Sequence, residues 1–326
     1  MGSEDLIIEV VGLTKSFSAV IALNDVSFKV YKGDVFGCLG SNGAGKTTAI
    51  RCILGLLKPS KGEVKIFGES SESAISRYGC KIGTALENPG LFDELTGEEN
   101  LEFYARILKI AKGERLRRTA LLLSFVGLEV KRREKVAAYS QGMKKRLILA
   151  RALLNDPDLL IFDEITSGLD PNQRKIFYEL VEHLKEEGKT IFFSSHVLSE
   201  VEGMCNRIII LHEGRTVFCD SLESLFLQFG RYVVTARLND NARVNEIANL
   251  PFVKNRWIKG NTITMFVSVN NIHEVSMILT PLGLLDITVN QIKLDDIYAK
   301  ILEPEDKTKE SVKHFRETFL KRVNGE

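Results

Sequence analysis

The chain has 326 residues, of which 44% are hydrophobic and 27% are charged. This profile is typical of a globular protein of about two domains, and it excludes a disordered or fibrous chain. The 44 Lys and Arg residues nearly balance the 43 Asp and Glu residues, so the formal net charge is +1. Such a balance gives no global attraction to nucleic acid or to an anionic membrane.

The longest apolar runs, at residues 159–162 and 208–211, have the size of a strand. A membrane-spanning helix would need roughly 20 apolar residues. The first residues show no basic region followed by an apolar stretch, which a secretory signal would require. The five cysteines are odd in number and form no CxxC pair, so we expect free thiols rather than disulfides or a zinc site. We therefore expect a cytoplasmic protein.

Strands are expected in the region before Gly40. Leu6–Val11 is apolar and β-branched, Val26–Val30 alternates apolar with polar residues, and Val35–Leu39 is a short apolar run. A helix is then predicted over Thr47–Leu57, because its apolar residues recur at helical spacing.

Helices are expected to dominate residues 96–150. Thr96 and Glu99 form a capping-box sequence, which predicts the start of a helix. Strand-like segments at 158–163 and 190–195 then flank a further helical pattern. Strands that alternate with helices predict an α/β sheet.

The chain is expected to divide into a first domain of residues 1–225 and an accessory module of residues 231–303. Within the module we expect strands at Tyr232–Leu238, Phe252–Trp257, Thr262–Val269 and Ile287–Ile292, and helices at 242–249, 272–280 and 294–302. This β-α-β-β-α-β order suggests a small ferredoxin-like α+β fold. Residues 304–326 are expected to form a charged helix or tail, which either docks on its own domain or contacts a partner.

The first chemical motif lies between an expected strand and an expected helix. It reads Gly-Ser-Asn-Gly-Ala-Gly-Lys-Thr-Thr over residues 40–48 and fits the phosphate-loop pattern G-x-x-x-x-G-K-[ST]. Backbone N–H groups of such a turn surround phosphate oxygens, and the following helix adds its dipole. Lys46 is expected to reach the β and γ phosphates, and the Thr47 hydroxyl to ligate Mg²⁺. The residues expected to bind ATP here are Ser41, Asn42, Gly43, Ala44, Gly45, Lys46, Thr47 and Thr48.

The apolar run at residues 159–162 is followed by two carboxylates, Asp163 and Glu164. Because side chains alternate along a strand, adjacent acids cannot point the same way while regular pairing holds. Two different roles are therefore expected. Asp163 would hold Mg²⁺, and Glu164 would polarise the attacking water.

Three further motifs lie around this acidic pair. Tyr-Ser-Gln-Gly-Met over 139–143 resembles the signature motif of ABC-type ATPases, which is LSGGQ in its commonest form. Ser-Gly-Leu-Asp over 167–170 resembles their D-loop, and Ser-Ser-His over 194–196 resembles their switch-histidine segment. The resemblance implies a P-loop NTPase sheet with an antiparallel β portion and a helical subdomain. It is closest to single-domain ATPases that serve ABC-2-type exporters of drugs, peptides or ions.

The resemblance also implies a mechanism. Two such domains would face head to tail, with each ATP between the phosphate loop of one domain and the signature motif of the other. Ser140 and the Gly142 N–H would contact the γ-phosphate, where the amides at a helix start are unpaired. Phe17 would stack on adenine, as the family's aromatic residue does. The expected catalytic residues are Glu164, His196 and Lys46, with His196 sensing the γ-phosphate.

The sequence departs from the family pattern at two places. The substituted signature positions are Tyr139, Gln141 and Met143. Glu87 stands where the family expects a glutamine that touches both Mg²⁺ and the membrane partner. A carboxylate there would ligate Mg²⁺ more strongly than an amide, and it would repel the γ-phosphate if unpaired. This variant is similar to that of exporters for bacitracin-like and lantibiotic peptides, so it points to export of a peptide antibiotic or drug.

The expected partners are a separate ABC-2-type permease and a second copy of the chain or a paralogous ATPase. The permease would hold the protein at the inner face of the cell membrane. Residues 88–110 are expected to receive a cytoplasmic helix of the permease, with Phe92 and Leu101 as contacts. No nucleic-acid partner is expected, because the basic run at residues 131–135 has no interleaved aromatics.

Two alternatives stay open. The first is a soluble ABC ATPase that acts on ribosomes or DNA. It is disfavoured because the translation-factor type carries two ATPase domains, whereas this chain has one phosphate loop. The chromosome type carries a long coiled coil, and no heptad stretch is present in this sequence. The second alternative concerns residues 231–303 alone, which are either a regulatory ligand-binding module or a passive cap on the dimer.

Overall fold

The structure is a computed structural model that describes residues 6–86, 90–230, 232–238, 253–259, 262–267 and 284–302. The chain forms two units, Met1–Cys219 and Asp220–Glu326. In none of the described ranges does a helix reach the length and hydrophobicity needed to cross a bilayer.

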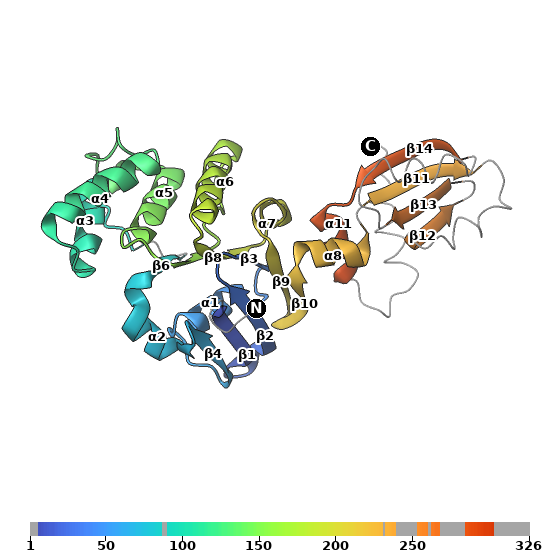
Figure 1. Cartoon of the computed structure of the whole chain (residues 1–326), viewed down its shortest axis with the longest axis horizontal. Coiled ribbons are helices and arrows are strands. Elements are labelled where there is room, and N and C mark those ends of the chain that lie inside the picture. Colours follow the sequence, from blue (N-terminus) through green and yellow to red (C-terminus); the bar gives the residue numbers. More distant parts are fainter. Residues whose placement is uncertain are drawn as a thin grey trace. The chain divides into compact units, whose positions relative to one another are not determined.

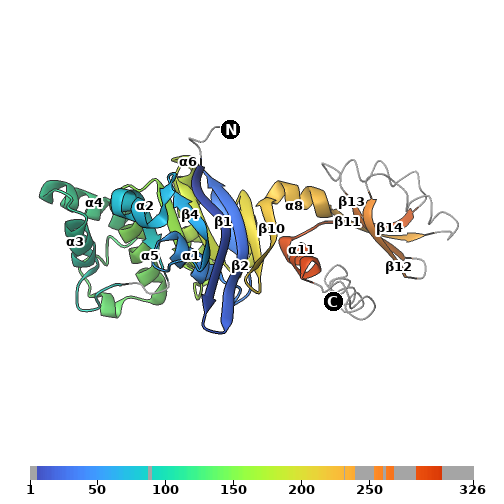
Figure 2. The same cartoon turned by 90° about the horizontal axis from the view of Figure 1, so that it is seen from below.

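The smaller sheet of the first unit has the strand order β2-β1-β4-β5, and its neighbouring strands pair antiparallel. Figure 2 shows β1, β2 and β4 side by side. The strands are β1 (Leu6–Phe17), β2 (Val20–Tyr31), β4 (Lys61–Ile66) and β5 (Glu69–Ser70). In β2, Val26, Phe28 and Val30 are buried and the residues between them are exposed, which confirms the alternation predicted from the sequence.

The larger sheet has the order β10-β9-β3-β8-β7-β6. Its strands are β3 (Val35–Leu39), β6 (Ile82–Ala85), β7 (Leu159–Asp163), β8 (Thr190–Ser195), β9 (Arg207–His212) and β10 (Arg215–Ser221). The pairings from β9 through β3, β8 and β7 to β6 are parallel. Every residue of β3, β7 and β8 is buried, as is typical of parallel strands with helices on both faces.

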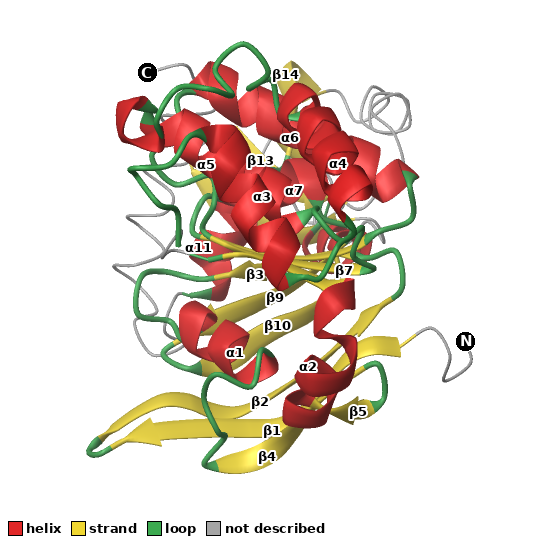
Figure 3. Ribbon diagram, turned by 90° about the vertical axis from the view of Figure 1, so that its left-hand side faces the viewer, coloured by secondary structure: helices red, strands yellow, loops and turns green. Residues whose placement is uncertain are grey.

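Seven α-helices are described in the first unit. They are α1 (Lys46–Ile53), α2 (Ser71–Tyr78), α3 (Gly97–Ile107), α4 (Lys112–Phe125), α5 (Gln141–Ala152), α6 (Pro171–Glu186) and α7 (Leu198–Met204). Helix α1 packs between the two sheets, against β2 and β4 on one side and β7 on the other (Figure 3). Helices α3, α4 and α5 pack on one another as a helical subdomain (Figure 1). This architecture confirms the predicted α/β sheet with an antiparallel portion and a helical subdomain.

Helix α1 is shorter than predicted. It ends at Ile53 rather than at Leu57, because Gly55 adopts the left-handed conformation with φ of 64°. The Gly55 N–H donates to the Cys52 carbonyl (3.1 Å) and the Leu56 N–H donates to the Arg51 carbonyl (2.8 Å). These two bonds form a Schellman motif, which satisfies carbonyls at a helix end.

The core joins the two sheets through stacked aromatic rings. Phe28 of β2, Phe36 of β3 and Phe192 of β8 stack pairwise. The ring centroid of Phe28 lies 5.4 Å from that of Phe36 and 5.9 Å from that of Phe192, and the Phe36 and Phe192 centroids are 5.7 Å apart. Each aromatic pair contributes about 0.5–1.5 kcal/mol beyond its buried area. The antiparallel sheet is thereby held at a defined place over the parallel sheet that carries the phosphate loop.

The second unit contains a four-stranded antiparallel sheet of order β12-β13-β11-β14. The elements are α8 (Leu222–Phe229), β11 (Tyr232–Leu238), β12 (Val253–Lys259), β13 (Thr262–Val267), β14 (Leu284–Gln291) and α11 (Leu294–Ile301). In this order β13 lies between β11 and β12, and β11 lies between β13 and β14. The helices expected at 242–249 and 272–280, and the tail 304–326, lie outside the described residues.

Candidate functional site

The carboxyl ends of three parallel strands meet at one edge of the larger sheet. Leu39 at the end of β3 pairs with Ser195 of β8, and Asp163 at the end of β7 pairs with Ser194. The segments that follow these strands are the phosphate loop, the acidic pair and the histidine segment. The topology therefore brings together three motifs that lie far apart in the sequence, at the edge where α/β sheets bind ligands.

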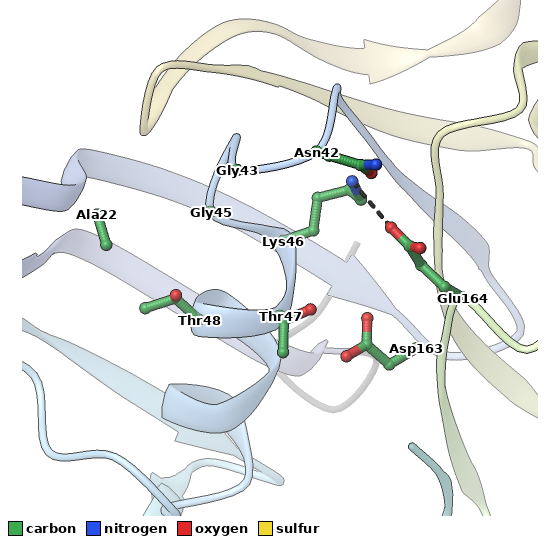
Figure 4. Close-up of a pocket in the computed structure, with 9 residues that line it drawn as sticks. All are labelled: Ala22, Asn42, Gly43, Gly45, Lys46, Thr47, Thr48, Asp163 and Glu164. Atoms are coloured by element: carbon green, nitrogen blue, oxygen red, sulfur yellow. Dashed lines mark ion pairs between the residues drawn. The ribbon is translucent and has the colours of Figure 1, made fainter. Parts of the chain in front are cut away.

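A pocket of about 320 Å³ lies at this edge (Figure 4), and its volume is that of a small-molecule site. It is lined by Ala22, Asn42, Gly43, Gly45, Lys46, Thr47, Thr48, Asp163 and Glu164. The lining thus includes both predicted acids and most of the predicted phosphate loop. Ser41 and Ala44 belong to the loop but do not line the pocket.

The phosphate loop requires glycine at its junction with α1. Gly45 has φ of 105°, and a Cβ built on it would lie 2.7 Å from the Ala22 carbonyl oxygen and 2.6 Å from a Leu23 methyl carbon. A residue with a side chain would be strained at this φ, and its Cβ would clash with Ala22 and Leu23. Strand β2 therefore forms a wall behind the loop. The sequence did not predict this role of Ala22, because no local pattern shows which strand packs behind the turn.

Lys46 is buried, and its ammonium group has three oxygen partners. Its Nζ donates to the carbonyl oxygens of Gly40 (2.9 Å) and Ser41 (3.0 Å). It also forms an ion pair of 3.1 Å with Glu164 Oε1, drawn as the dashed line in Figure 4. The cation is therefore held inside the loop and points into the pocket.

The two acids both line the pocket because regular pairing stops between them. Asp163 is the last residue of β7, and the Ser194 hydroxyl donates to its Oδ1 (2.6 Å). Glu164 has φ of 47°, and its N–H donates to the Ser194 hydroxyl oxygen (3.0 Å). The left-handed turn at Glu164 overrides the strand alternation. Ser194, for which the sequence predicts no separate role, orients both acids.

His196 lies beside Glu164 on the side away from Lys46. Its Nδ1 is 3.4 Å from Glu164 Oε2, a pair that is ionic when the imidazole is protonated. The imidazole is partly exposed. One carboxylate thus faces the loop lysine through Oε1 and the histidine through Oε2.

Phe17 lies at the end of β1, where it pairs with Val20 across the β1–β2 turn. It does not line the pocket, but 45% of it is exposed. The Lys15 ammonium lies 5.1 Å from its ring centroid, close enough for a cation–π contact. The ring has free surface on which a base can stack.

The signature segment begins α5 and lies apart from the pocket lining. Ser140 is the N-cap, and its hydroxyl oxygen accepts from the Met143 N–H (3.2 Å). A cap uses the hydroxyl as an acceptor, so its O–H remains able to donate to a phosphate oxygen. Gly142 follows in the first turn, where helix amides have no intrahelical partner.

Tyr139 shows what the first substitution in the signature does. The residue is buried, and its hydroxyl donates to the Lys131 carbonyl oxygen (2.8 Å). Gly97 packs directly against the same hydroxyl, since a Cβ on Gly97 would come within 2.3 Å of it. Burial raises the pKa of Tyr139. Tyr139 therefore ties the signature segment to the start of α3, a role that leucine cannot fill.

An aromatic cluster lies at α3 and consists of the exposed Phe92 and Phe103 and the half-buried Tyr104. The Phe92 ring is 4.8 Å from Phe103 and 6.3 Å from Tyr104, and 42% of Phe92 is exposed. The buried Asn100 side chain bonds both the N–H and the carbonyl oxygen of Phe92. The prediction that Leu101 is a surface contact is wrong. Leu101 is 0% exposed because it lies on the face of α3 that packs into the subdomain core.

The donor set of the pocket fits Mg²⁺. Thr47 and Asp163 both line it, and their oxygens are the hard ligands that Mg²⁺ prefers. Mg²⁺ usually takes one or two protein ligands and completes its shell with phosphate and water. Glu87, the third expected metal ligand, lies outside the described residues.

The Gln173 side chain of α6 covers the signature glycine. A methyl group on Gly142 would come within 2.3 Å of Gln173 Cδ and Oε1. Because these atoms are the movable end of a flexible side chain, we expect Gly142→Ala to lower ATP turnover by no more than about tenfold, an effect of about 1.4 kcal/mol. The double variant Gly142→Ala/Gln173→Ala should recover most of the rate in a steady-state ATPase assay. Gly113→Ala is the matched control, because nothing lies within 4 Å of its Cβ position. A double variant as slow as the single one would rule out the Gln173 clash as the cause.

The fold and the site together define a class of protein. A glycine-rich turn between a buried parallel strand and a helix, with a buried lysine facing two carboxylates, is the nucleotide site of a P-loop nucleoside triphosphatase. Residues 23–167 match the family model described as ABC transporter. The chain belongs to the ATP-binding proteins of this family, which bind ATP and couple its hydrolysis to transport.

Some similar proteins match about two thirds of the chain, and others match nearly all of it. The Nod factor export ATP-binding protein I of Rhizobium johnstonii is 41% identical over 210 residues, 64% of this chain and 68% of the relative. The bacitracin transport ATP-binding protein BcrA of Enterococcus faecalis is 32% identical over 303 residues, 91% of this chain and 97% of that one. A solved dimeric ATP-binding cassette in a post-hydrolysis state, bound to ADP and Pi, has a TM-score of 0.61. It is 27% identical and covers 66% of this chain and 99% of its own.

Proposed function

We propose that this chain is the ATP-hydrolysing subunit of an exporter and drives a separate ABC-2-type permease. The observation that carries the proposal is the pocket in which Lys46, Asp163 and Glu164 converge. The names of the relatives support export, since one serves Nod factor export and another serves bacitracin transport. The protein would then work in the cytoplasm, at the inner face of the membrane that holds its permease.

Each residue of the site has a separate proposed role in ATP hydrolysis. Lys46 binds the β and γ phosphates with the same ammonium that now bonds the loop carbonyls. Glu164 orients the attacking water and accepts its proton, and His196 contacts the γ-phosphate from the other side of that carboxylate. Thr47 and Asp163 would hold Mg²⁺, which neutralises charge on the phosphates when bound.

A second ATPase domain is part of the proposal. Ser140 and Gly142 carry the expected phosphate contacts but do not line the pocket of their own chain. A head-to-tail partner would bring its signature segment to this pocket, and it would be either a second copy or a paralogue. The similar dimeric cassette bound to ADP and Pi supports this arrangement.

The cargo proposed is a peptide antibiotic or a similar small molecule. Glu87 in place of the usual glutamine supports it, as does the bacitracin transport relative, which aligns over nearly its whole length. Residues 1–225 would form the nucleotide-binding domain, 231–303 an accessory α+β module, and 304–326 a charged helix or tail.

The aromatic cluster is the proposed contact for the permease. Phe92 and Phe103 are large, exposed and packed edge to face on each other, which is unusual for surface residues without a binding partner. We expect the full chain carrying Glu164→Gln, with ATP and Mg²⁺, to capture a polytopic membrane protein from detergent-solubilised membranes of the source organism. Adding Phe92→Ala should remove that protein from the eluate, as identified by mass spectrometry.

The control for this capture is Leu121→Ala, which truncates another exposed apolar side chain, on α4. It should leave the capture intact. If Phe92→Ala also leaves it intact, the contact surface lies elsewhere and the exporter assignment stands. Recovery of only ribosomal or DNA-bound proteins would favour the alternative, a soluble ABC ATPase that acts on ribosomes or DNA.

A further inference from the structure

Helix α7 carries a buried carboxylate, Glu200, that lies outside the nucleotide pocket. The residue is only 1% exposed and does not line the pocket. Burying a carboxylate is costly unless it is hydrogen-bonded. Its Oε1 is buried and has no hydrogen-bond partner within the part of the chain that the structure describes. A buried carboxylate with only one hydrogen-bonded oxygen destabilises the fold relative to an apolar side chain. The contacts that Glu200 does make therefore need an explanation.

Glu200 Oε2 joins two segments that flank the site. It accepts a hydrogen bond from Thr166 Oγ1 (2.6 Å) and another from Ser195 Oγ (2.7 Å). Both hydroxyl residues are buried. Thr166 directly precedes the Ser167–Asp170 segment, and Ser195 directly precedes His196. One carboxylate oxygen therefore links the D-loop-like segment to the histidine segment.

The Ser195 hydroxyl extends this link past His196. While it donates to Glu200, its oxygen accepts from the Val197 N–H (2.9 Å). Val197 is the residue after His196, so the same hydroxyl fixes the backbone on both sides of the histidine. A change in the position of Glu200 would be passed to His196 through this single side chain.

The Ser167 end is held from a second direction. Lys145, on the helix that begins at the signature segment, donates to the Ser167 carbonyl oxygen. Burial lowers the pKa of Lys145, and the carboxylates of Glu200 and Glu164 act against that shift. The ammonium therefore lies within the field of both acids. Residues from α5, α7 and the loop between β7 and α6 thus form one connected polar group.

We propose that Glu200 is a positioning residue for ATP hydrolysis, which holds Ser167–Asp170 and His196 in register beside Glu164. This proposal rests on the roles given to those segments under the proposed function. The carboxylate does not line the nucleotide pocket. It acts through Thr166 and Ser195, and its removal should slow turnover without weakening ATP binding.

The test compares Glu200→Ala with Glu200→Gln in the full chain. We expect Glu200→Ala to lower kcat by at least tenfold, with the Kd for a fluorescent ATP analogue unchanged. Glu200→Gln should keep most of the parent rate, because its amide oxygen can still accept from both hydroxyls. Glu202→Ala, on the same helix, controls for loss of a carboxylate from α7. Parent kcat in Glu200→Ala would overturn the proposal, and so would equal losses in the alanine and glutamine variants.

A second comparison separates positioning from folding. Ser195→Ala removes one of the two hydrogen bonds to Glu200 Oε2 and the bond from the Val197 N–H, with little change in volume, so it should fold even if Glu200→Ala does not. We expect it to lower kcat while the thermal midpoint stays within a few degrees. Adding Glu200→Ala to a His196→Ala background should lower kcat by much less than it does in the parent. A parent rate in Ser195→Ala would overturn the proposal. So would a double variant whose loss of kcat equals the product of the losses in Glu200→Ala and His196→Ala. A parent chain without any Mg²⁺-dependent ATPase activity would instead reject the proposed function.

Discussion

Replacing Glu164 with glutamine should stop ATP hydrolysis while leaving ATP bound. The amide keeps the size of the side chain and a hydrogen-bond acceptor, but it cannot take a proton from water. General-base catalysis contributes about 10²–10⁴-fold to such reactions, so turnover should fall by at least 100-fold. Removing a negative charge beside the phosphates should not weaken binding. We therefore expect ATP to hold the variant as a stable dimer, measured by light scattering after gel filtration.

The control for this variant is Glu63→Gln, which alters an exposed acid paired with Lys65 (3.3 Å). It should hydrolyse ATP at the parent rate. If Glu164→Gln hydrolysed ATP at that rate too, the catalytic carboxylate would have to be a different residue. A glutamine variant that lost both hydrolysis and ATP binding would instead indicate that Glu164 mainly holds Lys46 in place.

Replacing Lys46 with alanine should weaken nucleotide binding itself. The ammonium is buried at the centre of the loop, bonded to two backbone carbonyls and paired with Glu164. A hydrogen bond to a charged group contributes about 1.5–3 kcal/mol, so ATP affinity should fall by roughly tenfold to a hundredfold. Titration calorimetry with ATP and Mg²⁺ measures the change directly.

Lys65→Ala is the matched control, because it removes a lysine from an exposed ion pair that does not line the pocket. It should bind ATP as the parent does, since exposed pairs contribute little. The Lys46 and Glu164 variants then give opposite patterns, one losing affinity and the other losing only hydrolysis. Parent affinity in Lys46→Ala would contradict the role assigned to this lysine.

The parts of the site that the sequence predicted are those that follow from local chemistry. A phosphate loop is one continuous segment, so its glycines and lysine can be identified from the local sequence alone. The acidic pair was predicted because it ends an apolar strand. Even here the local rule was incomplete. Strand alternation would separate Asp163 from Glu164, and only the left-handed turn at Glu164 lets both reach the pocket.

The parts that the sequence did not predict depend on contacts between distant segments. Ala22 lies behind Gly45 only because β2 packs over α1. Gln173 covers Gly142 only because α6 lies beside α5, and nothing in the sequence around residue 173 indicates it. Leu101 was assigned to the surface because helical spacing gives the faces of a helix but not which face a neighbour covers. The side of α3 that packs on α4 and α5 decides that question.

The hydroxyl of Tyr139 has a thermodynamic consequence. It packs against Gly97, the first residue of α3, and α3 carries Phe103 and Tyr104 of the aromatic cluster. If a ligand binds the cluster more tightly once Ser140 has engaged phosphate, linkage requires that ligand to raise the phosphate affinity of the signature segment by the same factor. The coupling free energy between the aromatic cluster and the signature segment is therefore the same in both directions.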